Sequence, residues 1–354
     1  MSVHLISADE AMARYDQFSV VIDARSEGEY AEDHLPGALN WPSLNNEERI
    51  RVGTLYKQVS PFEAQKIGAA LVAANISRHI QTHVLDKPKG WQPLIYCWRG
   101  GKRSNSLALI LGQIGFKVHL IEGGYKAFRK AILEDTPRRV APLQFRVLCG
   151  PTGSGKTRLL QALAAQGAQV LDLEAIASHR ASVLGVIPGQ PQPTQKAFET
   201  QLWNALRRFD ADQPVYVEAE SKKVGNLSIP QCLMAAMRES PCLRLDLSLQ
   251  GRVQLLLQDY DYFVRDRDFF CQRLDRLVDL KGRAVVEDWK ARVQAGQTTQ
   301  VVAELLQSHY DPGYAQSTAR NFSQYGHAPD LRLAGPDWPA FEATARSLHA
   351  GQAV

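Results

Sequence analysis

The segment GPTGSGKT at residues 150–157 constrains the fold of this 354-residue chain more than any other feature. It matches the phosphate-loop pattern G-x-x-x-x-G-K-[ST] at every fixed position. Residues 145–149 before it form an apolar run that predicts a strand, and residues 158–165 after it predict an amphipathic helix. Since such a loop joins a parallel strand to a helix, the second half of the chain is expected to be a P-loop α/β domain.

The loop residues are expected to bind phosphate. The glycines let consecutive backbone N–H groups point at phosphate oxygens. Lys156 would neutralise the terminal phosphates, and Thr157 is a candidate Mg²⁺ ligand, although the sequence fixes no metal site. No tightly bound cofactor is expected. The residues assigned to phosphate binding are Gly150, Gly153, Ser154, Gly155, Lys156 and Thr157.

The pattern predicts phosphate binding and leaves hydrolysis open. An ATPase needs an acidic residue at the end of a second strand to hold Mg²⁺. Asp172 and Glu174 follow one short apolar run, and Glu218 and Glu220 follow another. Either pair is a candidate, and each is equally typical of ordinary loop acids. Whether the loop binds ATP or GTP also stays open.

Strand-like and helix-like segments alternate along the chain, which predicts parallel sheets in both halves. A charged segment at residues 134–143 with two prolines predicts an extended boundary between domains at 1–136 and 137–354. From residue 252 to about 308 the pattern predicts helices. For the tail that follows, the sequence predicts no secondary structure. Strands are expected at residues 19–23, 94–96, 117–121, 145–149, 170–173, 215–217 and 243–247, and helices at 61–74 and 103–114.

The composition excludes several classes of protein. No apolar stretch is long enough to span a bilayer, and the first residues do not resemble a signal peptide. The net charge of +4 is too small to indicate a nucleic-acid partner by itself. The five cysteines never occur in CxxC pairs, which favours a reducing compartment over a disulfide scaffold or a structural zinc site. A cytoplasmic location without membrane attachment is expected.

A second chemical signal is the segment YCWRGGKRS at residues 96–104. It places Cys97 between an apolar strand and a helix, where backbone N–H groups and a helix N-terminus favour a thiolate and bind oxyanions. Bases and glycines are poor material for a buried core, so a reactive cysteine is favoured over a structural one. The residues expected to form an anion-binding loop around Cys97 are Arg99, Gly100, Gly101, Lys102 and Arg103.

Four ordered motifs over residues 5–133 resemble the rhodanese, or sulfurtransferase, domain. They are DAR at 23–25, HLPGA at 34–38, the Cys97 loop, and EGGYKA at 122–127. The resemblance implies that Cys97 accepts sulfur as a persulfide. The spacing Cys97-x5-Arg103 differs from that of many rhodaneses and is similar to the longer loops of rhodanese-related phosphatases. This loop is therefore expected to hold a phosphate-sized anion.

A rhodanese-like domain followed by a P-loop domain resembles the family of tRNA 2-selenouridine synthases. The resemblance implies a transferase that replaces sulfur by selenium from selenophosphate in tRNA with 2-thiouridine at the wobble position. It also implies S-geranylation with geranyl diphosphate as the activating step. In this hypothesis the P-loop takes the diphosphate, and Cys97 handles selenium through a selenium-bearing cysteine. A protein that supplies selenophosphate is a candidate partner. The segments similar to the family are 52–64, 97–104, 150–157, 171–174, 178–180, 217–221 and 309–312.

Two alternatives stay open at this point. The first is a sulfurtransferase or phosphatase that a nucleotide-binding P-loop domain regulates. The second is a non-catalytic RNA-binding or assembly protein that uses an inherited fold, since a fold does not fix a function. Residues 308–314, SHYDPGY, contain two aromatic side chains and a turn and are expected to serve packing only.

Overall fold

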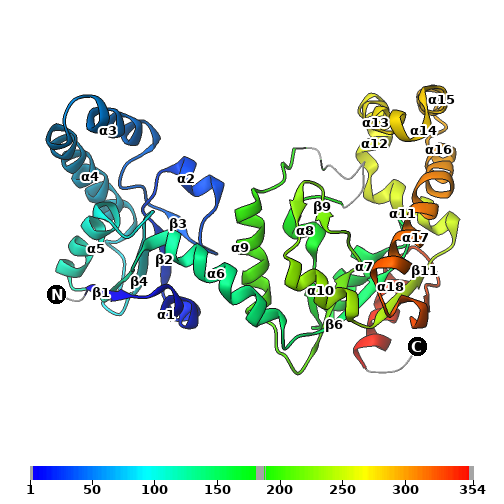
Figure 1. The fold of residues 1–354 in the computed structure, drawn as a ribbon, viewed down its shortest axis with the longest axis horizontal. Coiled ribbons are helices and arrows are strands. Elements are labelled where there is room, and N and C mark those ends of the chain that lie inside the picture. The colour runs from blue at the N-terminus through cyan, green and yellow to red at the C-terminus, as the bar shows by residue number, and fades with distance from the viewer. Residues whose placement is uncertain (1–2, 181–186, 188, 351–354) are drawn as a thin grey trace. The chain divides into compact units, whose positions relative to one another are not determined.

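The computed structural model describes residues 3–180, 187 and 189–350. It divides the chain into two compact units (Figure 1). The first unit consists of Met1–Pro137 and Pro193–Asn204, and the second of Arg138–Gln192 and Ala205–Val354. The chain therefore leaves the first unit, returns to it for one helix, and then completes the second unit.

A five-stranded parallel sheet forms the centre of the first unit, in the order β1-β5-β4-β2-β3. Its central strands are buried, as the apolar runs at 19–23, 94–96 and 117–121 predict. Cys97 follows the end of β4, which is the carboxyl edge of the sheet. The strands are β1 (Val3–Ile6), β2 (Val20–Asp23), β3 (Leu39–Asn40), β4 (Pro93–Tyr96) and β5 (Val118–Ile121).

Helices surround this sheet. Helix α4 begins at Pro61 as predicted, because Ser60 caps its N-terminus, but it continues well beyond the predicted end to His83. Helix α5 ends where Gly115 adopts a left-handed conformation with φ of 114°. The helices are α1 (Ala8–Ala13), a 3₁₀ turn (Tyr15–Gln17), α2 (Glu27–Glu32), α3 (Asn46–Gln58), α4 (Pro61–His83), α5 (Lys102–Ile114), α6 (Gly124–Val140) and α9 (Gln195–Leu206).

Helix α9 belongs to the first unit although it lies far along the chain. The Trp203 ring packs edge-on against the rings of Tyr15 and Phe128, with centroid distances of 6.1 and 5.7 Å. Glu199 pairs with Arg129 on α6. From its position in the sequence, this helix would be assigned to the second half of the chain. The contacts that place it in the first unit join residues more than sixty positions apart, so the local sequence pattern does not predict them.

The expected extended segment at 134–143 is wrong. Helix α6 continues to Val140 and contains Pro137 in its interior. The Thr136 hydroxyl donates to the carbonyl of Ile132 one turn earlier. Proline has no backbone N–H, so the helix lacks one backbone hydrogen bond at Pro137, and the chain passes from one unit to the other without an extended linker.

The second unit has its own five-stranded parallel sheet, in the order β12-β11-β6-β8-β7. Strand β6 is central and leads directly into residues 150–157. Strand β8 lies beside it and ends at Glu218. The strands are β6 (Gln144–Cys149), β7 (Gln169–Leu171), β8 (Pro214–Glu218), β11 (Cys242–Asp246) and β12 (Asp330–Arg332), with a separate hairpin of β9 (Lys223–Val224) and β10 (Leu227–Ser228).

The C-terminal part of the second unit is mostly helical, as predicted, and its tail adds β12 and α18 to the core. Phe341 and Ala345 of α18 are buried in the same cluster as Leu159 of α7. Within the described residues no helix has the length and apolarity needed to cross a membrane. The helices are α7 (Lys156–Ala165), α8 (Leu173–Ala177), α10 (Gln231–Glu239), α11 (Leu249–Asp259), α12 (Asp261–Arg265), α13 (Arg267–Leu274), α14 (Val278–Lys281), α15 (Arg283–Gln294), α16 (Thr298–Leu305), α17 (Asp311–Asn321) and α18 (Trp338–His349), with 3₁₀ turns at Asp275–Leu277 and Tyr325–His327 and a π-helical turn at Leu306–Tyr310.

Both units are parallel-sheet α/β folds, and the second has a helical C-terminal part, so the predicted fold class is confirmed.

Candidate functional site

Cys97 lies between the end of β4 and the N-terminus of α5, as the sequence predicts. Its Sγ accepts a hydrogen bond from the backbone N–H of Gly101 at 3.3 Å and another from the Ser104 hydroxyl at 3.0 Å. The side chain is only 2% exposed. These donors hold the sulfur at a helix N-terminus, the position in a fold that favours bound anions.

The EGGYKA motif at 122–127 holds the backbone of this loop. The N–H of Tyr125 donates to the carbonyl of Cys97 at 2.8 Å. Gly124 has φ of 57°, and a Cβ there would lie 2.2 Å from the Cys97 carbonyl oxygen. Only glycine permits this close approach. The Trp98 ring stacks on Tyr125 with a centroid distance of 5.4 Å, so in this structure it packs beside the cysteine loop.

The bases of the loop differ in their surroundings. Arg99 and Lys102 are exposed. Arg103 donates to Glu29 at 2.7 Å, and the same carboxylate pairs with Arg49 of α3 at 3.2 Å. Partial burial acts to raise the pKa of Glu29, but the hydrogen bond and charge of Arg103 outweigh it and lower the pKa. The loop geometry therefore includes a glutamate that the sequence analysis did not identify.

The phosphate loop has the conformation that its motif predicts. Gly153 and Gly155 have φ of 78° and 89°. A Cβ at Gly153 would lie 2.9 Å from the side chain of Leu256, and one at Gly155 would lie 2.5 Å from the Phe341 ring. Both positions therefore require glycine for the turn and for close packing.

Lys156 and Thr157 have polar partners inside the loop region. The Lys156 ammonium donates to the carbonyl of Gly150 at 2.6 Å. The Thr157 hydroxyl donates to Glu174 at 3.1 Å, and the backbone N–H of Glu174 donates to the Glu218 carboxylate at 3.0 Å. The structure thus brings acids from both predicted pairs to the phosphate loop.

Glu218 and Glu220 are buried, and Glu174 is partly buried. Burial, the largest cause, raises the pKa of Glu174, and it raises those of Glu218 and Glu220 far more strongly. Neighbouring carboxylates raise the pKa of Glu218 further. A buried carboxylate cluster of this kind is stabilised by a cation or by protonation.

The donor set fits one Mg²⁺ ion bound together with a diphosphate. Within the described ranges no group of three or more His, Cys, Asp or Glu side chains has the arrangement of a metal site. Mg²⁺ instead commonly takes one or two protein oxygens and completes its shell with phosphates and water. Thr157 and Glu174 offer such oxygens side by side, and Glu218 Oε2 is buried without a hydrogen-bond partner in the described structure.

Replacing Glu218 with Gln is expected to raise the melting temperature at pH 8 in EDTA by about 2–4 °C, the shift that ~1 kcal/mol produces in a domain of this size. In the folded protein burial holds the pKa of Glu218 well above its ordinary value of 4.5. Above pH 4.5 the unfolded chain therefore releases this proton more readily than the folded protein, and the wild-type protein loses stability as the pH rises. The amide removes this dependence and keeps an oxygen for the N–H of Glu174. Melting curves from pH 4 to pH 8 test this, and a constant difference between the two proteins contradicts it.

Residues 308–314 do more than pack, so that expectation is wrong. The Tyr314 hydroxyl accepts the N–H of Gly150 at 2.5 Å, and the Lys156 ammonium lies 5.5 Å from the Tyr314 ring centroid. Asp311 pairs with the buried Arg252 at 2.6 Å, and Arg252 also donates twice to the carbonyl of Thr152. The segment therefore fixes the phosphate loop. The spacing of its aromatic residues gives no signal of this role, because the contacts span more than fifty positions.

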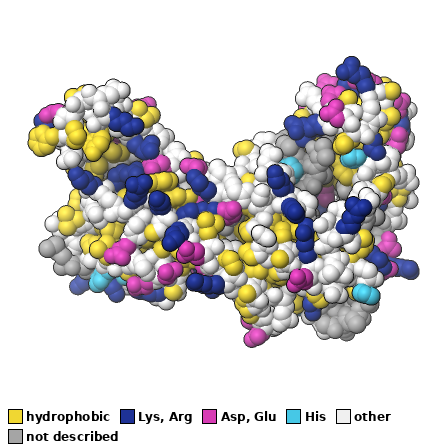
Figure 2. Space-filling model, viewed as in Figure 1, with side chains coloured by type: hydrophobic (Ala, Val, Ile, Leu, Met, Phe, Trp, Pro, Cys, Tyr) yellow, Lys and Arg dark blue, Asp and Glu magenta, His cyan; other side chains and the backbone are white. Residues whose placement is uncertain are grey.

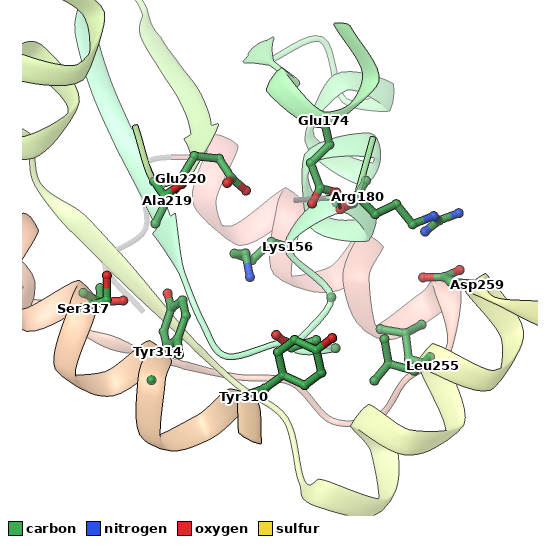
Figure 3. A pocket seen from close by; sticks show the side chains of 18 of the residues that line it. Lys156, Glu174, Arg180, Ala219, Glu220, Leu255, Asp259, Tyr310, Tyr314 and Ser317 are labelled. Atoms are coloured by element: carbon green, nitrogen blue, oxygen red, sulfur yellow. Dashed lines mark hydrogen bonds between the residues drawn. The ribbon is translucent and has the colours of Figure 1, made fainter. Parts of the chain in front are cut away.

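A cavity of about 390 Å³ opens over the phosphate loop. Figure 3 shows Lys156 in the middle, with Glu174 and Glu220 on one side and Tyr310 and Tyr314 on the other. Lysine and loop N–H groups at one wall can bind a diphosphate, while the tyrosines form a less polar wall. This arrangement suits a phosphorylated substrate.

Comparisons with known proteins cover both units. A family model described as the tRNA 2-selenouridine synthase AAA domain matches residues 143–275, and a rhodanese-like domain model matches residues 7–131. The tRNA 2-selenouridine synthase of Marinobacter nauticus is 34% identical over 278 residues, which cover 73% of this chain and 74% of the relative. That of Nitrosomonas europaea is 36% identical over 72% of this chain and 67% of its own, and that of a Sulfurovum species 30% over 86% and 90%.

Proposed function

The chain belongs to the family of tRNA 2-selenouridine synthases, and from this premise we propose that it replaces the sulfur of wobble 2-thiouridine in tRNA by selenium in two steps. The observation that supports two steps is the presence of two different loops between a parallel strand and a helix, one with a thiol and one with a lysine beside two acids. A single transfer would need only one of them.

In the first step, the phosphate loop holds the diphosphate of geranyl diphosphate. The 2-thio sulfur attacks the first carbon of the geranyl group, the carbon–oxygen bond breaks, and diphosphate leaves with the electron pair while the base loses its N3 proton. Lys156 and the loop N–H groups stabilise the charge that develops on the leaving diphosphate. Mg²⁺, held by Thr157 and Glu174 when bound, would supply further neutralisation of that charge.

In the second step, Cys97 acts on selenophosphate. Its thiolate attacks phosphorus, the phosphorus–selenium bond breaks, and selenide leaves with the electron pair. Selenide adds to C2 of the S-geranylated base, and geranylthiol leaves. Water then releases phosphate from Cys97. This route is redox-neutral, whereas placing selenium itself on the sulfur would need an oxidant, so we prefer it to the selenium-bearing cysteine.

Helix α3 offers a surface suited to the tRNA. None of its residues is buried, and Ile50 and Tyr56 are 65% and 57% exposed. Arg51 and Lys57 are exposed on the same helix, and its acids lie in the first turn. Figure 2 shows Lys and Arg side chains beside hydrophobic ones at this end of the first unit. Exposed aromatics and bases together are typical of surfaces that bind unpaired nucleotides.

The position of this surface supports its role. Arg49 of α3 and Arg103 of the cysteine loop share the Glu29 carboxylate, which ties the helix to the catalytic loop. An RNA loop bound along α3 would therefore reach the neighbourhood of Cys97.

The double variant Arg51→Glu/Lys57→Glu is expected to weaken tRNA binding about tenfold or more and to reduce the slope of log affinity against log salt by about 2, because two phosphate contacts are lost. Filter binding between 50 and 200 mM salt measures both effects. Lys117→Glu/Lys130→Glu, which reverses two exposed bases of the same unit, is the matched control. An equal loss in the control contradicts the proposed surface.

The experiment that tests the function is nucleoside mass analysis of 2-thiouridine tRNA incubated with the protein, geranyl diphosphate, selenophosphate and Mg²⁺. We expect the S-geranyl mass first and the seleno mass afterwards. An unchanged 2-thiouridine mass, with intact donors and tRNA, contradicts the proposal. Phosphate release from simple esters, or sulfur transfer from thiosulfate to cyanide, would then support the phosphatase or sulfurtransferase alternative.

A further inference from the structure

A second, smaller cavity lies beside the phosphate loop and has a different character. Its volume is about 50 Å³, and its walls come from helices of the C-terminal part. Apart from Thr152, Thr298 and two tyrosines, every lining residue is apolar. Its apolar lining includes Phe270, Val302, Leu305 and Leu306.

This apolar cavity adjoins the cavity over the phosphate loop. Thr152, Leu256, Tyr260 and Tyr310 line both of them. A ligand whose phosphates lie on the loop therefore meets an apolar wall on one side. A ribose or a base would leave its polar groups without partners against such a wall, which is costly. A hydrocarbon gains free energy there.

The backbone between these cavities has an unusual form. Residues Leu306–Tyr310 form a π-helical turn, a feature frequently found at functional sites. The turn directs Leu306 to the apolar cavity and Tyr310 to both cavities. Asp311 follows at once and holds Arg252, which binds the Thr152 carbonyl of the phosphate loop. One segment thus fixes the phosphate loop and shapes the apolar cavity.

We infer that the apolar cavity receives the hydrocarbon tail of an alkyl diphosphate whose diphosphate lies on the phosphate loop, and that Val302, Leu306 and Phe270 set the length of the tail. The inference rests on the proposed function, in which the phosphate loop holds geranyl diphosphate. It adds the residues that recognise the chain. Because the apolar cavity is small, only the far end of a ten-carbon chain enters it. The carbons of the chain nearest the diphosphate then lie over the phosphate loop.

The test compares the affinities of geranyl diphosphate, dimethylallyl diphosphate and inorganic pyrophosphate, measured by calorimetry with Mg²⁺ and without tRNA. We expect geranyl diphosphate to bind the wild-type protein at least tenfold more tightly than pyrophosphate, and dimethylallyl diphosphate to fall between them. Val302→Phe, which fills the cavity from α16, is expected to remove most of the geranyl advantage and to leave pyrophosphate affinity within twofold. Gln300→Phe adds the same ring on an exposed position of α16 and is the matched control.

A second variant tests the same inference if Val302→Phe does not fold. Val302→Thr keeps the shape and adds a hydroxyl, so it is also expected to lower the ratio of geranyl diphosphate to pyrophosphate affinity. An unchanged ratio in Val302→Phe or Val302→Thr overturns the inference, as does a wild-type ratio near one.

The two failures are distinguishable. If the wild-type protein geranylates tRNA but the variants keep the wild-type ratio, the proposed function stands and the tail lies elsewhere. If the ratio falls as expected but tRNA is never modified, the cavity binds alkyl diphosphates and the proposed function is wrong.

Discussion

Replacing Cys97 with Ser is expected to reduce the rate of selenium incorporation by about 10³-fold or more. S-geranyl tRNA should then accumulate as the product. Removal of an activated nucleophile typically costs at least this factor. The serine hydroxyl fits the same space and still meets the N–H of Gly101, but it is a much weaker nucleophile toward phosphorus at neutral pH. Geranyl transfer uses the other loop and should proceed at nearly the wild-type rate.

Time courses of both nucleoside masses measure this prediction. Cys232→Ser makes the same chemical change on α10, at a residue that lines neither cavity, and should behave as the wild-type protein does. Mass analysis of the wild-type protein quenched during turnover should also show phosphate on the peptide that contains Cys97. Selenation at the wild-type rate by Cys97→Ser would exclude a covalent role for this cysteine.

Replacing Lys156 with Ala is expected to reduce geranyl transfer by about 10²–10³-fold, the usual cost of removing one group that stabilises transition-state charge. Lys156 is the lysine of the phosphate-loop motif, its ammonium donates to the Gly150 carbonyl, and it lines the cavity. The variant should still convert tRNA that already bears S-geranyl groups into the seleno form, because that step uses Cys97.

Separate assays of the two steps therefore form the decisive measurement. Lys130→Ala, which removes an exposed lysine from α6, is the control for a general loss of positive charge. If Lys156→Ala retains geranyl transfer and loses only selenation, the assignment of the two loops is reversed. Complementary defects in Cys97→Ser and Lys156→Ala would establish that the two loops act in sequence.

Local sequence predicts the parts of the fold that depend on neighbouring residues. The strand, loop and helix around residues 150–157 and the cysteine loop between β4 and α5 lie where expected. Buried parallel strands appear as short apolar runs, and a phosphate loop has a fixed pattern of glycines. Both signals extend over a few residues and need no knowledge of the rest of the chain.

The unpredicted features depend on contacts between distant residues. Arg103 meets Glu29, and Arg252 joins the phosphate loop to Asp311, across 74 and 59 positions respectively. The tail residue Tyr314 reaches Gly150 across 164 positions. Pairings of this kind have no periodic signal, so a single sequence gives the residue types but not their partners.

The return of α9 to the first unit affects how the protein is made. Domains generally fold as they emerge from the ribosome, at about 5–20 residues per second. The rings of Tyr15 and Phe128 have no Trp203 to pack against until α9 has been synthesised. Once residue 137 has been added, the first unit waits roughly 3–13 s for its last helix. During that interval an apolar surface of the nascent chain is available to chaperones, and completion of the N-terminal unit is coupled to translation of the second.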